Sequence, residues 1–126
     1  MQPGDLDVLI VDDHEAMRTL LVRVLAKAGV DRVRTAEGGA EALGLLRERQ
    51  ANLILADNQM PGMNGREFVA TVRGEPAFGA PKIVIVSGNA DAAFAANAKA
   101  VGADAVLVKP VLLADLLAAI NKLFAV

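Results

Sequence analysis

Residues 7–29, DVLIVDDHEAMRTLLVRVLAKAG, contain the pattern that decides the fold. Residues 8–11 form an unbroken apolar run of the length of one buried strand. Apolar residues then return at helical spacing, and Gly29 marks the end of that pattern. The returning residues are Met17, Leu20, Leu21, Val24 and Leu25. The stretch therefore predicts a β-strand followed directly by an amphipathic α-helix.

The same alternation of strand and helix occurs five times along the chain. Strands made of continuous Val, Ile and Leu are buried on both faces, which requires a parallel sheet with helices on each side. We therefore expect an α/β doubly wound sandwich of three layers. The predicted strands are 7–12, 31–36, 51–57, 81–88 and 103–110, and the predicted helices are 14–28, 38–50, 65–74, 90–102 and 112–126.

Length and composition exclude several classes of protein. The 126 residues fit a single domain, expected to span residues 1–126. The chain has no cysteine and one histidine, which excludes disulfides, Cys-ligated zinc and a polyhistidine metal site. No signal sequence and no long apolar run are present, so we expect a cytoplasmic protein without membrane contact. The net charge of −2 and the lack of Trp and Tyr argue against direct nucleic-acid binding.

Polar side chains stand at the carboxyl ends of the predicted strands. Asp12 and Asp13 end the first strand, Asp57 the third, Ser87 the fourth and Lys109 the fifth. Ligands of open α/β sheets bind at this edge, so we expect these side chains to converge. Any single Asp here could instead cap the following helix. Acids within about 4 Å of one another repel by about 4 kcal/mol at an effective dielectric near 20, so a cluster of three needs cations.

Lys109 supplies one positive charge, and a divalent ion would supply the rest. Oxygen ligands with room left for water are the coordination that Mg²⁺ prefers. A carboxylate can attack a phosphoryl group to form an acyl phosphate, and the transition state needs cations and hydrogen-bond donors around its oxygens. The edge therefore predicts phosphoryl transfer to an Asp, assisted by Mg²⁺, Lys109 and Ser87.

Four segments in this order resemble the receiver domain of two-component response regulators, in particular the stand-alone chemotaxis type. They are LIVDDHEAMR at 9–18, LILADNQMPGMNG at 53–65, VSG at 86–88 and VLVKP at 106–110. Each motif is weak by itself, but four in register are specific, and the likeness spans nearly the whole chain. It implies a flavodoxin-like sheet with strand order 2-1-3-4-5.

The resemblance also implies roles for the acids. Asp57 would be the phosphoacceptor. Asp13, Asp57 and the backbone carbonyl of Gln59 would ligate Mg²⁺, and Asp12 would act on the metal through water.

The remaining implied roles concern the phosphoryl group and the partners. Ser87 would hydrogen-bond a phosphoryl oxygen by moving toward it, Lys109 would pair with the phosphate, and the Lys109–Pro110 peptide would be cis. A sensor histidine kinase or phosphotransfer protein would be the donor. The signal would pass to a downstream protein or a missing output domain through the face made by predicted helices 90–102 and 112–126 and strand 103–110. The chain would be a monomer or a weak, phosphorylation-dependent dimer, assisting its own phosphorylation and dephosphorylation without being an enzyme.

Two positions depart from the family pattern. Val106 stands three residues before the lysine, where receivers usually carry Tyr or Phe, so the usual aromatic switch is missing. Val111 follows Pro110, where Phe is common. With Leu112 these two residues are candidates for partner contact. Elsewhere, we expect His14 to face solvent in the first helical turn, and Met60 and Met63 to pack beneath the loop after Asp57.

Two other classes share parts of this pattern. A haloacid-dehalogenase phosphatase also uses a strand-terminal Asp and Mg²⁺, but it needs a second acid two residues later, where this chain has Gln59. A flavin-binding module would bind phosphate on a Ser/Thr-rich loop after the first strand, and that loop is acidic here. The sequence therefore fits a phosphatase or a flavin-binding module less well than it fits a receiver domain.

Overall fold

The structure, a computed structural model, describes residues 2–89 and 91–124. Its strands are β1 (Asp7–Val11), β2 (Arg32–Ala36), β3 (Leu53–Asp57), β4 (Lys82–Ser87) and β5 (Ala105–Val108). Its helices are α1 (Glu15–Lys27), α2 (Gly39–Glu48), α3 (Gly65–Arg73), α4 (Ala92–Ala100) and α5 (Leu113–Phe124), with short 3₁₀ turns at Pro3–Asp5 and Pro76–Phe78. The predicted order of elements is confirmed. Residue 90 of the predicted fourth helix and residues 125–126 of the predicted fifth lie outside the described residues.

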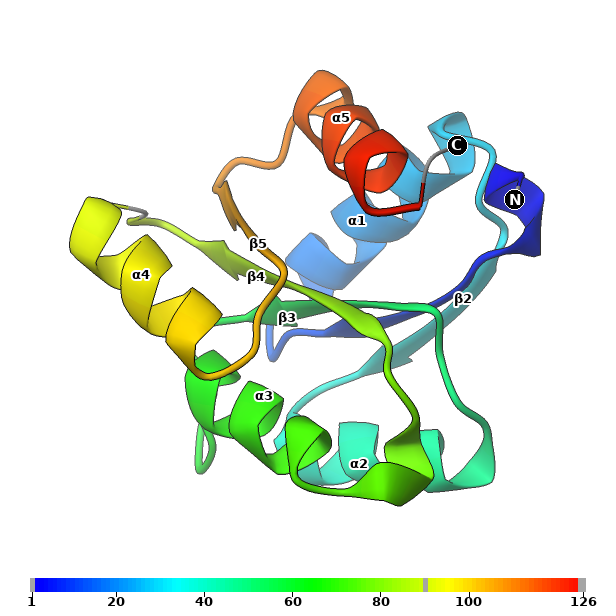
Figure 1. Cartoon of the computed structure of the whole chain (residues 1–126). Helices are drawn as coiled ribbons and strands as arrows, with labels where there is room; N and C mark the ends of the chain where they lie inside the picture. Colours follow the sequence, from blue (N-terminus) through cyan, green and yellow to red (C-terminus); the bar gives the residue numbers. More distant parts are fainter. Residues whose placement is uncertain (1, 90, 125–126) are drawn as a thin grey trace.

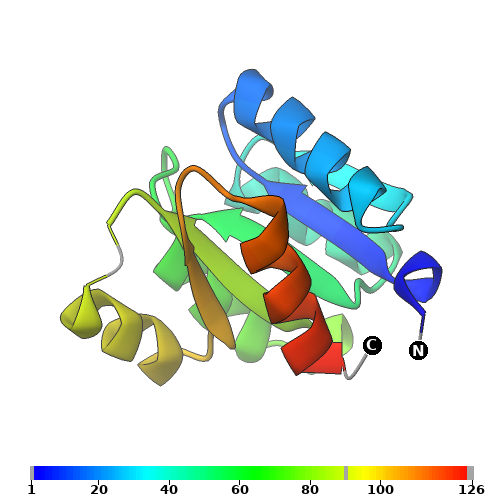
Figure 2. The same cartoon turned by 90° about the horizontal axis from the view of Figure 1, so that it is seen from above.

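The strands form one parallel sheet in the order β2-β1-β3-β4-β5. Figures 1 and 2 show α1 and α5 on one face of the sheet and α2 and α3 on the other. Helix α4 lies near β5 and joins the α2 and α3 side of the core through Ala98. The three-layer sandwich is therefore the one that the sequence pattern predicted, and the strand order is the one that the family resemblance implied. No helix among the described residues is long and apolar enough to cross a membrane.

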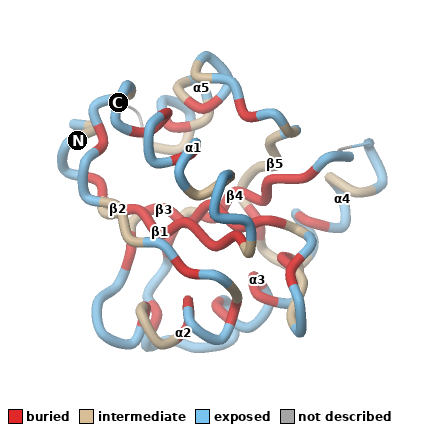
Figure 3. Tube along the Cα trace, turned by 180° about the vertical axis from the view of Figure 1, so that it is seen from behind, coloured by how far each residue is buried: buried red, intermediate tan, exposed pale blue. Residues whose placement is uncertain are grey.

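The core has one layer on each face of the sheet, because successive strand side chains point to opposite faces. Leu9 and Ile54 pack on the α2 and α3 side, whereas Ile10 and Leu55 pack on the α1 and α5 side. Figure 3 shows the burial concentrated in the central strands. The edge strands β2 and β5 are mostly half-buried or exposed, so continuous burial holds only for β1, β3 and β4.

Two predictions about packing have opposite outcomes. Met60 is buried and Met63 packs against the same core layer, as expected. The prediction that Val111 contacts a partner is wrong, because its side chain is only 5% exposed and belongs to the α1 and α5 core layer. Val111 lies just before α5 begins, where the chain returns onto the sheet. The exposed aliphatic side chains of this region are Val108 and Leu112.

Candidate functional site

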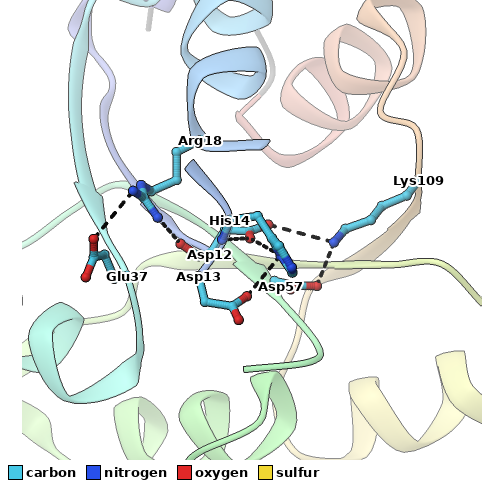
Figure 4. A network of polar contacts seen from close by, with 7 residues as sticks. All are labelled: Asp12, Asp13, His14, Arg18, Glu37, Asp57 and Lys109. Carbon is cyan, nitrogen blue, oxygen red and sulfur yellow. Dashed lines mark hydrogen bonds and ion pairs between the residues drawn. The ribbon is translucent and has the colours of Figure 1, made fainter. Parts of the chain in front are cut away.

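The carboxyl ends of the parallel strands bring the predicted site residues to one edge of the sheet. Asp12 directly follows β1, and Asp57 is the last residue of β3. Ser87 ends β4, and its carbonyl accepts a hydrogen bond from the Lys109 amide at 2.8 Å. Figure 4 shows the acids and Lys109 facing one another across this edge. The convergence predicted from the sequence is thus present in the fold.

The acids form a tight and largely buried cluster. Asp12 is 1% exposed and Asp57 is 4% exposed. One ligand atom from each of Asp12, Asp13, His14 and Asp57 lies within 4.8 Å of the others. Such crowding of like charges is unfavourable unless cations lie among them.

Lys109 provides part of the compensating charge. Its Nζ lies 3.0 Å from Asp57 Oδ1 and 3.8 Å from Asp12 Oδ2. Three carboxylates and one ammonium leave two negative charges unbalanced in the cluster. A divalent cation would neutralise them.

The hydrogen bonding of the acids also fits a cation. Asp12 Oδ1 accepts a hydrogen bond from the His14 amide at 2.8 Å, but Asp12 Oδ2 is buried and has no hydrogen-bond partner. Asp13 Oδ1 is likewise buried and has no hydrogen-bond partner. Because buried polar atoms are almost always satisfied in proteins, both oxygens are suited to bind a cation. Carboxylate oxygens are the ligands that hard divalent ions prefer, so the residues present fit Mg²⁺.

A cavity of about 380 Å³ opens beside Asp57. Gln59, Ser87 and Lys109 line it, together with the Phe94 side of α4. The volume is large enough for a phosphoryl group and several waters. The Gln59 residue predicted to offer its carbonyl therefore lies at the site.

Ser87 is held by the loop that follows it. Its Oγ donates a hydrogen bond to the Asn89 carbonyl at 2.8 Å and accepts one from the Asn89 amide at 3.2 Å. A hydroxyl that turned toward Asp57 would have to give up both bonds. Movement of Ser87 would therefore also release the backbone at Asn89.

The segment after Asp57 is fixed by the start of α3. Asn64 and Glu67 form a capping box, in which each side chain accepts from the other's backbone amide at 2.8 and 3.0 Å. A Cβ added to Gly65 would lie only 2.8 Å from the Asp57 carbonyl oxygen. Glycine at this position lets α3 approach β3 closely beside the Asp57 backbone.

The structure also shows site residues that the sequence analysis missed. His14 is exposed, as expected, but its Nδ1 lies 3.1 Å from Asp13 Oδ1. Arg18 on α1 donates to the Asp12 carbonyl at 2.8 Å (Figure 4). Phe94 lines the cavity and carries the Arg66 guanidinium 5.5 Å above its ring. The sequence offered a signal for Phe94, because aromatic residues are rare in this chain, with four Phe and no Tyr or Trp, and Phe94 follows Ser87 closely.

Val106, the position where the family resemblance leads one to expect an aromatic residue, is aliphatic and half-buried. Val106 packs against the core layer that also contacts Phe94. The Lys109–Pro110 peptide, which follows β5, is cis, as the resemblance implied.

A parallel α/β sheet with a buried acid cluster, a lysine and a hydroxyl at one edge defines a class of phosphoryl-accepting domains. The model of the response regulator receiver domain family matches residues 8–121, and the chain belongs to that family. Neither this match nor the relatives below support the phosphatase alternative.

Similar proteins and structures agree with this assignment. The Rhizobium etli protein named "Probable chemotaxis protein CheY" is 32% identical over 119 residues, which cover 94% of this chain and 92% of that protein. The chemotaxis protein CheY4 of Vibrio cholerae has a similar structure, with a TM-score of 0.85 at 33% identity over 93% of this chain and 97% of that chain. The sensory/regulatory protein RpfC of Xanthomonas campestris is 36% identical over 112 residues. The matched segment covers 87% of this chain but only 15% of the length of RpfC.

Proposed function

We propose that this receiver domain accepts a phosphoryl group on Asp57. Receiver domains are signalling phosphoacceptors that pair with histidine kinases and phosphotransfer proteins. The observation that carries the residue assignment is the Lys109 ammonium 3.0 Å from a nearly buried Asp57 carboxylate that opens onto the cavity. Of the three acids, Asp57 is the one that lines this cavity.

The transfer itself needs little from the protein beyond positioning and charge. An Asp57 carboxylate oxygen forms a bond to phosphorus as the bond from phosphorus to the donor's imidazole nitrogen breaks, and that nitrogen then takes a proton from water. Lys109 lies where it can balance charge on the phosphoryl oxygens. The Ser87 hydroxyl can donate to one of these oxygens after leaving Asn89.

The metal site proposed for this reaction is formed by Asp13, Asp57 and the backbone carbonyl of Gln59, with Asp12 acting through water. Bound Mg²⁺ would reduce the electrostatic repulsion between the Asp57 carboxylate and the negatively charged phosphoryl group that approaches it. Asp12 is held by the His14 amide and by the Arg18 bond to its carbonyl, so its side chain is already oriented. The oxygens without hydrogen-bond partners on Asp12 and Asp13 support this placement.

We further propose that the signal leaves through α4, β5 and α5. Leu112, a candidate for partner contact from the sequence, is 57% exposed, and Val108, which is 51% exposed, takes the place of the buried Val111. The partner is a downstream protein or an output domain, and the chain itself acts as a signalling module and not as an enzyme on a separate substrate. The cytoplasmic location, the single domain over 1–126 and the monomeric or weakly dimeric state stay predictions.

Intact-mass measurement tests the acceptor. A small phosphodonor such as acetyl phosphate with Mg²⁺ is expected to add one phosphoryl group to the wild-type protein and none to Asp57→Asn. Asp91→Asn is a suitable control, because Asp91 is an exposed acid that caps α4 outside the cluster. A phosphoryl group on the Asp57→Asn variant would show that the acceptor is misassigned.

A further inference from the structure

His14 places a nitrogen atom at the edge of the acid cluster. It is the residue before α1, and its side chain makes no capping hydrogen bond to the helix. Its Nδ1 instead lies 3.1 Å from Asp13 Oδ1 and 3.3 Å from Asp12 Oδ1 (Figure 4). The ring therefore turns toward the carboxylates although 68% of the side chain is exposed.

Hydrogen bonding to the acids only partly accounts for this position. Asp12 Oδ1 already accepts the short bond from the His14 amide at 2.8 Å, and the ring contact to it is longer. Asp13 Oδ1 is close to the ring nitrogen, yet it has no hydrogen-bond partner. Nδ1 and the oxygens of Asp12, Asp13 and Asp57 thus border one common space.

The donor set of that space is mixed. Carboxylate oxygens suit Mg²⁺, whereas an imidazole nitrogen adds affinity for Co²⁺ and Zn²⁺, less for Mn²⁺ and little for Mg²⁺. An oxygen-only cluster would discriminate less strongly among these ions.

We propose that His14 Nδ1 is a ligand of the cation in this site, and that it makes the site selective for transition-metal ions such as Mn²⁺, Co²⁺ and Zn²⁺ over Mg²⁺. The inference rests on the proposed divalent site and adds the nitrogen ligand and the metal preference. Because His14 immediately precedes α1, the cation would then be tied to the start of this helix as well as to β1 and β3.

The test compares the metal affinities of untagged wild-type protein and His14→Phe by calorimetric titration with Mg²⁺, Mn²⁺, Co²⁺ and Zn²⁺. Phe keeps a ring of similar shape and removes both nitrogens. We expect the variant to lose about tenfold or more in affinity for Co²⁺ and Zn²⁺, the scale of changes close to a metal, with a smaller loss for Mn²⁺ and a change of less than about twofold for Mg²⁺. His14→Ala should give the same pattern, and thermal melts in EDTA should show that both variants fold.

Glu15→Gln is the matched control, because this exposed neighbouring acid lies outside the cluster and its loss should affect all four ions alike. The imidazole nitrogens of ¹⁵N-labelled protein give a direct readout, since His14 is the one histidine of the sequence. Zn²⁺ should shift Nδ1 and leave Nε2 nearly unchanged.

Equal losses for Mg²⁺ and the transition metals, or an unshifted Nδ1, would overturn the role of His14 while leaving the proposed function standing. Absence of binding by any of the four ions to the wild-type protein would overturn the proposed metal site as well.

Discussion

Crowded negative charge is the main electrostatic feature of Asp12, Asp13 and Asp57. Asp12 and Asp57 are nearly fully buried, and Asp13 is 27% exposed at the mouth of the cluster. Lys109 contacts Asp12 and Asp57. Among the described residues, no lysine or arginine side chain forms an ion pair with Asp13. Asp13 is therefore the acid whose charge depends most on a bound cation.

Asp13→Asn should remove the stabilisation of the fold by Mg²⁺. Because the unfolded chain cannot assemble the site, Mg²⁺ at ten times its dissociation constant should add about 1.4 kcal/mol to the free energy of unfolding of the wild type and nothing to that of the variant. Without metal the variant should be as stable as wild type or more stable, since one of three crowded charges is gone. Urea unfolding with Mg²⁺ and with EDTA measures both effects.

Asp31→Asn is the control for the loss of one negative charge, because Asp31 is exposed in the loop between α1 and β2. It should keep the full response to Mg²⁺. A metal-free Asp13→Asn protein that unfolds well before wild type would contradict the repulsion argument and indicate a structural role for Asp13.

Between elements, α3 approaches β3 closely beside the site. A Cβ on Gly65 would lie 2.8 Å from the Asp57 carbonyl oxygen and 2.9 Å from the Asn58 Cα. Both contacts are to backbone, which cannot move aside as a flexible side chain can. Gly44 in α2 offers the opposite case, because nothing lies within 4 Å of a Cβ added there.

Alanine substitution at the two glycines should therefore have opposite effects. Gly44→Ala should raise the free energy of unfolding by up to about 1 kcal/mol, the gain in helix propensity. Gly65→Ala should lower it by about 1–3 kcal/mol through overpacking, and should slow phosphorylation by displacing Asp57. Urea unfolding and the rate of mass gain with acetyl phosphate measure these two effects. If Gly65→Ala matched wild type in both, α3 would not position Asp57.

Across the whole molecule, the candidate site at Asp57 and α4 are joined through Ser87 and the loop that follows it. Ser87 Oγ holds the Asn89 backbone, and Asp91 caps α4 by accepting from the Phe94 amide at 2.8 Å. Phe94 in turn lines the cavity at Asp57. Val106 has one stiff χ1 torsion and is too short to fill the space that a moving Ser87 would leave.

We therefore expect phosphorylation to move the loop after Ser87 and the start of α4, with little rotamer change on β5. Ser87 would exchange its bonds to Asn89 for a charge-assisted bond to the phosphoryl group. An aromatic ring at position 106 would contribute to the free-energy difference between the inactive and active conformations, and this chain lacks that ring. Phosphorylation should therefore shift the equilibrium between the two conformations only modestly. Amide chemical shifts with and without beryllofluoride measure the response.

Ser87→Ala is the matched variant, since alanine has no hydroxyl to make the new bond and is small enough to fit the same place at the end of β4. Its beryllofluoride complex should show much smaller shifts at Gly88, Asn89 and the first turn of α4. Large changes confined to the β5 side chains, with Ser87 and its loop unmoved, would contradict this route.

The sequence was sufficient for the architecture because the signals concerned are local. The apolar run at 8–11 and the helical spacing that follows it are properties of neighbouring residues, and they recur five times. Parallel pairing then places all the strand ends at one edge, so Asp12, Asp57 and Ser87 could be assigned to one site before any contact was known.

The tertiary structure alone decided how individual side chains are turned and how deeply they are buried. Val111 became core because the chain returns over the sheet before α5, and β5 became half-exposed because it is the last strand in the order of the sheet. The ring of His14 faces Asp13, and a Cβ on Gly65 would meet Asp57, because segments distant in sequence meet in space. Periodicity reports which face of an element is apolar, but contacts such as these depend on the packing of several elements at once, so only the folded chain shows them.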